Sequence, residues 1–192
     1  MSDDKKNLII ESAIKVLSTE NYQSMKTAMI AKEAGVAQGT IYLYFKSKQE
    51  IFTEVILSIG DKMAAIYFEN VSELNRISEN LTIIVKNFYN RRKETEGIYR
   101  IIYKAFSELE DRNIKRILDE IFERIISSIS TIINWGIKKK EIELKEIDVR
   151  FASTLIFGFT ETVWKRDILS DSKLTEEDLQ SSLSKIMSLI TV

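Results

Sequence analysis

Side chains that form hydrogen bonds without carrying a negative charge are concentrated between Lys26 and Lys48. The stretch Gly35–Phe45 reads GVAQGTIYLYF and holds an amide, a threonine hydroxyl and two phenols, but no aspartate or glutamate. Amides and hydroxyls donate to phosphate oxygens and contact base edges, whereas carboxylates are repelled by a phosphate backbone. The chemistry that these residues favour is therefore recognition of nucleic acid.

The composition removes most of the side chains on which catalysis and metal binding depend. The 192 residues include no histidine and no cysteine, so the commonest general base, the commonest metal ligand and all disulfides are excluded. We expect no metal site and no cofactor. An all-α enzyme that uses glutamate or lysine is the catalytic alternative, and no obvious pairing of carboxylates supports it. The net charge of −1 does not by itself indicate a nucleic-acid partner.

Most of the chain has the apolar spacing of amphipathic helices. There is no proline and there are only six glycines, so helices can run long without interruption. We predict an all-α protein with about nine helices. The expected spans are residues 8–17, 30–34, 37–44, 48–69, 80–91, 98–106, 114–137, 148–164 and 176–190. No apolar run reaches the ~18 residues of a membrane helix, and the polar N-terminus lacks a signal-peptide pattern, so we expect a cytoplasmic protein without a membrane partner.

The spacing from Thr27 to Ile41 is typical of a helix-turn-helix. Ala31 is small where two helices would cross, and Gly35 allows the positive φ of a sharp turn between them. Val36 and Ile41 then pack the second helix against the first. The alternative is two ordinary packed helices in which Gly35 is only a C-cap, and the flanking residues favour DNA binding over it.

The stretch Thr27–Phe52, TAMIAKEAGVAQGTIYLYFKSKQEIF, resembles the DNA-binding region of the TetR family of transcriptional regulators. The resemblance implies a homodimer whose two recognition helices enter successive major grooves of a palindromic double-stranded operator. It also implies a repressor rather than an enzyme. Residues 1–46 would form the helix-turn-helix domain, and residues 47–192 the ligand-binding and dimerisation domain, with the last two long helices at the dimer interface.

The same resemblance implies which residues contact DNA. The set is Lys26, Thr27, Gln38, Gly39, Thr40, Tyr42, Tyr44 and Lys48, with Lys46 as an additional electrostatic contact. Gln38 and Gly39 would face base edges, and glutamine can pair with adenine through two hydrogen bonds. Tyr42 and Tyr44 diverge by about 200° around a helix, so we expect Tyr42 to reach phosphate while Tyr44 lies partly against Phe45.

Three positions depart from the pattern of many relatives. Ala28 replaces an arginine that contacts bases in some of them, Leu43 replaces a larger side chain, and Tyr44 replaces a histidine. These departures shift the expected recognition toward thymine methyl groups and DNA shape.

A second stretch, Gly136–Val163, is similar to the matching segment of TetR-type repressors of fatty-acid degradation. This resemblance implies that a hydrophobic effector, long-chain fatty acyl-CoA, releases the protein from DNA. The alternative effector is a hydrophobic drug or metabolite, in a regulator of an efflux pump. A DNA-binding architectural protein without an effector is a further alternative.

The candidate effector-binding residues are aromatic, aliphatic or basic, and they lie within Gly136–Val163, upstream of it or directly after it. They are Phe88, Tyr89, Arg92, Tyr99, Ile102, Tyr103, Phe106, Phe122, Ile126, Trp135, Phe159 and Trp164. Aromatic residues at helical spacing are more often core than pocket lining. Arg91, Lys93, Arg100 and Lys104 are further candidates for the CoA phosphates, although the basic run at residues 91–93 also suits a solvated helix end.

Overall fold

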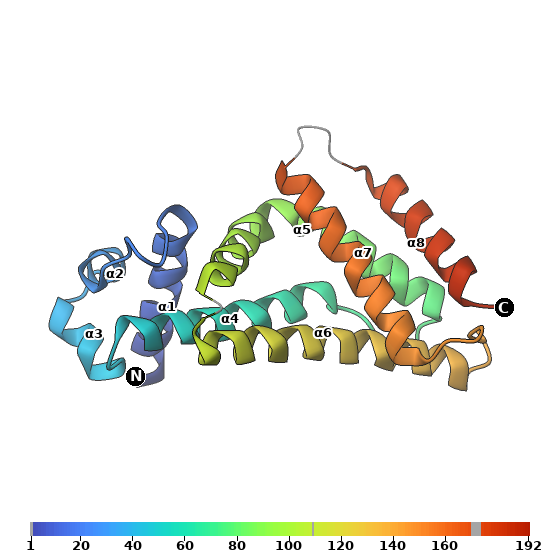
Figure 1. Ribbon diagram of the computed structural model, residues 1–192, viewed down its shortest axis with the longest axis horizontal. Helices are drawn as coiled ribbons and strands as arrows, with labels where there is room; N and C mark the ends of the chain where they lie inside the picture. Colours follow the sequence, from blue (N-terminus) through green and yellow to red (C-terminus); the bar gives the residue numbers. More distant parts are fainter. Residues whose placement is uncertain (1, 109, 170–173) are drawn as a thin grey trace. The chain divides into compact units, whose positions relative to one another are not determined.

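The chain forms eight α-helices in a computed structural model that describes residues 2–108, 110–169 and 174–192 (Figure 1). The helices are α1 (Ser2–Thr19), α2 (Thr27–Ala34), α3 (Gln38–Tyr44), α4 (Lys48–Tyr67), α5 (Ile77–Ala105), α6 (Arg112–Lys138), α7 (Val149–Leu169) and α8 (Glu176–Ile190), with a 3₁₀ turn η1 (Phe106–Glu108). The prediction of an all-α fold is confirmed. None of the helices within these ranges is long and apolar enough to cross a membrane.

Two of the predicted helices are parts of a single one, which is why the count is eight rather than nine. The segments 80–91 and 98–106 belong mostly to α5. The residues between them read RKETEG, and arginine, lysine and glutamate are good helix formers. The apolar periodicity lapses there while the backbone remains helical, so the hydrophobic pattern indicated a break that does not exist.

The described residues pack as two compact units, each built from two separate stretches of the chain. The first unit comprises Met1–Lys62 and Glu94–Ile121, and the second comprises Met63–Lys93 and Phe122–Val192. The predicted boundary between residues 46 and 47 separates a DNA-binding domain from a ligand-binding and dimerisation domain. It is a boundary of function rather than of packing, and it stays a prediction.

The core of the first unit brings the three short N-terminal helices together with the beginning of α4. Its fully buried side chains include Ile9, Leu17, Met25, Ile30, Ile41, Phe45, Ile51 and Phe52. Ser47 begins α4 as a helix cap, because its hydroxyl accepts a 3.0 Å hydrogen bond from the N–H of Glu50. The Glu50 carboxylate in turn accepts from the N–H of Lys46 at 2.6 Å. This arrangement fixes the direction in which the chain leaves α3.

In the second unit, α6 buries a stripe of isoleucines and α7 packs small residues toward it. Ser153 on α7 is fully buried, and its hydroxyl lies 2.8 Å from that of Ser130 on α6. The helix α8 begins with a capping box between Thr175 and Asp178, and these hydrogen bonds lower the pKa of the Asp178 carboxyl. The other end of α8 is joined to the α6–α7 connection by an antiparallel bridge between Leu144 and Thr191.

Gly136 on α6 is required by a close approach inside the second unit. A Cβ atom there would lie 2.9 Å from Cδ1 of Ile77 and 3.2 Å from Cγ1 of Ile142. We expect Gly136→Ala to lower the free energy of unfolding by about 1–3 kcal/mol, because overpacking outweighs the gain in helix propensity. The control is Gly97→Ala on α5, where the nearest atom, Cβ of Ser18, lies at 3.9 Å. Thermal melts should show Gly97→Ala at or above the wild-type midpoint, and an equal midpoint for Gly136→Ala would contradict the packing argument.

Candidate nucleic-acid interface

The turn between α2 and α3 has the geometry that its sequence predicts. Gly35 adopts φ 66° and ψ 30° in the left-handed region. The N–H of Val36 then donates to the carbonyl of Ala31 at 3.0 Å, which closes the end of α2. Ile41 is fully buried and Ala31 nearly so, as expected where two helices cross closely. The helix-turn-helix prediction is thus confirmed in its geometry.

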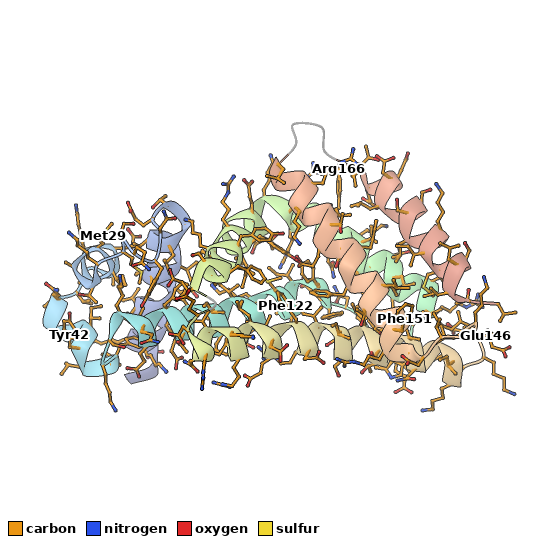
Figure 2. The ribbon with its side chains drawn as sticks, in the orientation of Figure 1. Met29, Tyr42, Phe122, Glu146, Phe151 and Arg166 are labelled. Carbon is orange, nitrogen blue, oxygen red and sulfur yellow. The ribbon has the colours of Figure 1, made fainter. Side chains whose placement is uncertain are left out.

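The helix α3 leaves one face exposed, and that face carries no acidic residue. Gln38 and Gly39 are exposed at its beginning. Tyr42, which is labelled in Figure 2, is exposed on α3. Its exposed fraction is 54%, and that of Leu43 is 82%. Tyr44 is half-buried beside Phe45, which is fully buried. The two tyrosines therefore differ in exposure in the direction that their angular separation predicts.

A hydroxyl at the beginning of α2 connects two of the predicted DNA contacts on α3. The oxygen of Thr27 lies 3.1 Å from the Tyr42 hydroxyl. It also accepts a 3.2 Å hydrogen bond from the side-chain amide nitrogen of Gln38. This bond uses one of the two N–H donors of Gln38, so its amide oxygen and its second N–H are available to a base. The sequence indicated each of these residues, but the bonds that join them depend on the crossing of α2 and α3.

The beginning of α2 is a second place that favours an anion. Lys26 precedes the helix with extended backbone, and no side chain caps this end. Neither α2 nor α3 has an acidic residue in its first turn. Unpaired N–H groups at a helix N-terminus attract phosphate, and the exposed ammonium groups of Lys26 and Lys46 add to this attraction.

In the first unit, two lysine side chains donate hydrogen bonds to backbone carbonyls at the end of α1 or in the connection between α1 and α2. They are Lys48 and Lys104. Lys48 donates to the carbonyls of Tyr22 at 2.8 Å and Gln23 at 3.3 Å, and its ammonium lies over the Tyr22 ring. Phosphate would therefore compete with two carbonyls for Lys48, whose role in DNA binding stays a prediction. Lys104 on α5 donates to the carbonyls of Leu17 at 2.8 Å and Glu20 at 2.9 Å.

Lys104 therefore caps the C-terminal end of α1. Burial lowers the pKa of its ammonium, and the nearby Arg100 lowers it further, whereas Glu20 raises it. Sequence reasoning placed Lys104 among the candidates for CoA phosphates. The periodicity of α5 gave no sign that this side chain reaches back to α1, since such a contact spans more than eighty residues of sequence.

The candidate effector-binding residues fall into two groups. Those in the first unit are Tyr99, Ile102, Tyr103 and Phe106, and those in the second are Phe88, Tyr89, Arg92, Phe122, Ile126, Trp135, Phe159 and Trp164. The side chain of Trp164 lies outside those that the structure describes. Four of the others are buried as ordinary core residues, namely Phe88, Tyr99, Ile102 and Ile126. Their role in effector binding stays a prediction.

The remaining aromatic candidates have neighbours of their own within each unit. The rings of Tyr103 and Phe106 lie 6.4 Å apart in the first unit. In the second unit, the ring of Phe122 lies 5.5 Å from that of Phe157. The guanidinium of Arg92 lies over the Tyr89 ring at 4.3 Å and donates to the carbonyl of Leu174 at 3.4 Å. Arg92 is thus held by the protein and only half-buried, which keeps it accessible to an anion.

The helix α7, one of the two helices predicted to form the dimer interface, presents an exposed apolar stripe. Phe151, which is labelled in Figure 2, is exposed on α7. Its exposed fraction is 53%, that of Leu155 is 42%, and Gly158 is exposed one turn further on. Ala152 and Ile156, on a different side of this helix, are buried against the chain itself. The outward stripe therefore consists of positions 151, 155 and 158, at the spacing of one helix face.

No ion site accompanies these surfaces in the described part of the chain. Its aspartates and glutamates nowhere gather in a group of three or more that could hold a metal ion.

Comparison with known proteins shows which proteins this chain resembles. Residues 9–55 match the sequence model of the tetR family of bacterial regulatory proteins. Over 184 residues the chain is 28% identical to the fatty acid metabolism regulator protein of Bacillus subtilis (strain 168), an alignment that covers 93% of this chain and 91% of that protein.

Solved structures show the same fold. FadR from Bacillus subtilis, in complex with stearoyl-CoA, matches with a TM-score of 0.71 and 26% identity over 95% of each chain. A TetR-family protein from Vibrio parahaemolyticus matches with a TM-score of 0.80 and 22% identity, over 98% of this chain and 99% of that one.

Proposed function

We propose that this chain is a transcriptional regulator of the TetR family and a homodimeric repressor of a palindromic operator. We further propose that a hydrophobic effector, long-chain fatty acyl-CoA, releases it from DNA and thereby regulates fatty acid metabolism. Such a protein acts where the chromosome lies, which in a bacterium is the cytoplasm.

The exposed face of α3 carries the proposal of operator binding. An α-helix fits the major groove, where an amide oxygen can accept from the exocyclic amine of adenine or cytosine. Gln38 offers that oxygen, because its bond to Thr27 uses only an N–H donor. Leu43 is 82% exposed, and an aliphatic side chain in the groove contacts the methyl group of thymine. Tyr42 and the first turn of α2 would hold the adjacent phosphates.

We expect the hydroxyl of Thr27 to contribute as much to operator affinity as the side chains that it positions, Gln38 and Tyr42. We expect Thr27→Val, which keeps the shape of the side chain, to lower operator affinity about tenfold or more, because hydrogen bonds to both Gln38 and Tyr42 are lost. Tyr42→Phe should reproduce part of this loss, whereas Tyr44→Phe should have little effect. The control is Thr131→Val on α6, whose hydroxyl bonds only to its own helix.

Fluorescence anisotropy on an operator selected from random DNA by the wild-type protein measures these affinities. Equal losses of operator affinity in Tyr42→Phe and Tyr44→Phe would show that the two tyrosines do not have the separate roles assigned to them. An unchanged affinity of Thr27→Val would remove the proposed role of the hydroxyl.

The proposal of a homodimer is supported by the apolar stripe on α7. Phe151 and Leu155 expose large apolar surfaces beside Gly158, where a partner helix could approach closely. With α7 and α8 from each protomer, such an interface would be a four-helix bundle. Symmetric dimers match palindromic operators, because each half-site then meets one recognition helix.

The proposal of an acyl-CoA effector is supported by the relatives and by the aromatic residues of the two units. The Bacillus subtilis relative is a fatty acid metabolism regulator, and FadR was solved with stearoyl-CoA. Apolar side chains such as Phe122 and Phe159 suit an acyl chain, and Arg92 suits a CoA phosphate. Effector binding would shift the population between protomer arrangements that fit the operator and those that do not.

Titration of the protein–operator complex with acyl-CoA thioesters of different length tests this effector. Octadecanoyl-CoA should release the operator at lower concentration than octanoyl-CoA, and free CoA should have no effect, because the apolar contacts scale with chain length. No release by any thioester would eliminate acyl-CoA and leave a hydrophobic drug or metabolite, acting on an efflux-pump promoter, as the alternative. Operator binding itself would remain intact in that case.

A further inference from the structure

A groove in the second unit lies apart from every candidate effector-binding residue. It encloses about 710 Å³ and is bounded by the beginning of α5, the turn after α6 and one face of α8. None of the aromatic or basic candidates described above lines it. Pockets of roughly 300–1,000 Å³ hold small organic ligands in proteins. The groove therefore has the size of a ligand site.

Specific contacts, rather than loose packing, give this groove its form. The carboxylate of Glu141 accepts a 2.6 Å hydrogen bond from the N–H of Ile77, which fixes the turn after α6 to the beginning of α5. The chain after α6 also contacts the C-terminal end of α8. There the N–H of Val192 donates to the carbonyl of Glu143 at 2.9 Å, and the N–H of Lys145 donates to the carbonyl of Ile190 at 3.0 Å. These contacts hold α8 to the same turn, so the groove is closed along one end.

The lining of the groove combines apolar and charged side chains with five uncharged polar ones, which are Ser78, Thr82, Gln180, Ser184 and Thr191. Six aliphatic or thioether side chains form the apolar part: Ile77, Leu81, Val85, Ile142, Leu183 and Met187. The charged side chains are Arg76, Lys139 and Glu141, two cations and one anion, which leaves one positive charge in excess. A ligand with an apolar body and one negative charge complements this lining.

Arg76 is the cation that remains available to such a ligand. The ammonium of Lys139 donates to the carbonyls of Glu73 and Asn75, and Glu141 is bound to the N–H of Ile77. The guanidinium of Arg76 has no hydrogen bond or ion pair with any residue in the described ranges, and its side chain is exposed. A guanidinium binds a carboxylate through two parallel hydrogen bonds.

We propose that this groove is a second ligand site, which binds an amphipathic monoanion by its carboxylate on Arg76 and its apolar body along α5 and α8. The proposal is independent of the effector, because it concerns different residues and makes no claim about release from DNA.

The absence of cysteine from the natural sequence allows a direct test by alkylation. Ser184 lines the groove and is exposed, so Ser184→Cys places a reactive thiol inside it. Ser181, also exposed on α8, lies outside the lining and provides the matched Ser181→Cys control. Dodecanoate is the probe, and 1-dodecanol is its uncharged counterpart.

Saturating dodecanoate should slow the alkylation of Ser184→Cys about tenfold or more and leave that of Ser181→Cys unchanged. In the Ser184→Cys background, Arg76→Gln should weaken protection by dodecanoate about tenfold, as expected for loss of a charge-assisted pair. Lys86→Gln, an exposed position on α5 outside the groove, should not weaken it.

Three results would overturn the proposal. They are unchanged alkylation of Ser184→Cys with dodecanoate, equal protection by 1-dodecanol, and full protection in the Arg76→Gln variant. Thermal melts of each variant show whether it is folded, and operator binding, measured separately, reports on the proposed repressor function.

Discussion

Leu43→Glu is expected to reduce operator affinity about a hundredfold or more while leaving the protein folded. Leu43 is 82% exposed, so its replacement costs the core almost nothing. On DNA, however, the new carboxylate would face the phosphate backbone, and bringing like charges together at an interface costs several kcal/mol. Each 1.4 kcal/mol corresponds to about a tenfold change in affinity. The contact with a thymine methyl group would be lost as well.

The measurement is anisotropy with the selected operator, together with thermal melts of the free protein. Leu74→Glu is the matched control, because Leu74 is 93% exposed and lies far along the sequence in the connection between α4 and α5. The control should bind like the wild type. Retention of wild-type affinity by Leu43→Glu would mean that α3 does not enter the groove with this face.

Phe151→Glu is expected to convert the proposed dimer into monomers and, as a result, to weaken the proposed operator binding by a factor on the order of 10²–10⁴. Phe151 exposes half of its surface on one chain, and a dimer would bury it. A buried, unpaired carboxylate opposes association strongly. Once the protomers separate, each recognition helix binds its half-site alone, and the advantage of linked binding disappears.

Sedimentation velocity measures the oligomeric state, and anisotropy measures the affinity. Leu74→Glu again serves as the control and should remain dimeric. A dimer of unchanged stability in Phe151→Glu would place the interface elsewhere, and a monomeric wild-type protein would contradict the proposed dimer altogether.

The helix-turn-helix could be predicted because its requirements are local. Gly35 must turn with positive φ, and Ala31 and Ile41 must pack within a few residues of that turn, so spacing alone carries the information. The unbroken course of α5 could not be predicted from the apolar pattern. Where a long helix passes through a polar stretch, its periodicity disappears although its backbone hydrogen bonds continue.

Contacts between segments that are distant in the sequence could not be predicted from hydrophobic periodicity. The pattern around Lys104 indicates an exposed polar position on a helix, yet its ammonium caps α1. On α7, Phe151, Ala152, Leu155 and Ile156 all fit an interface by residue type, but the structure exposes only Phe151 and Leu155 of these four. Apolar spacing identifies which positions are buried, but which helix buries them depends on the tertiary arrangement.

The discontinuous first unit also sets an order of events during synthesis. The helices α1–α3 leave the ribosome first, but their unit includes residues 94–121, and Lys104 within that stretch satisfies two carbonyls near the end of α1. Domains fold as units when their residues are available, so this one is completed only after more than half of the 192 residues have been translated. A nascent chain released before that point therefore lacks the two hydrogen bonds from Lys104 to the end of α1.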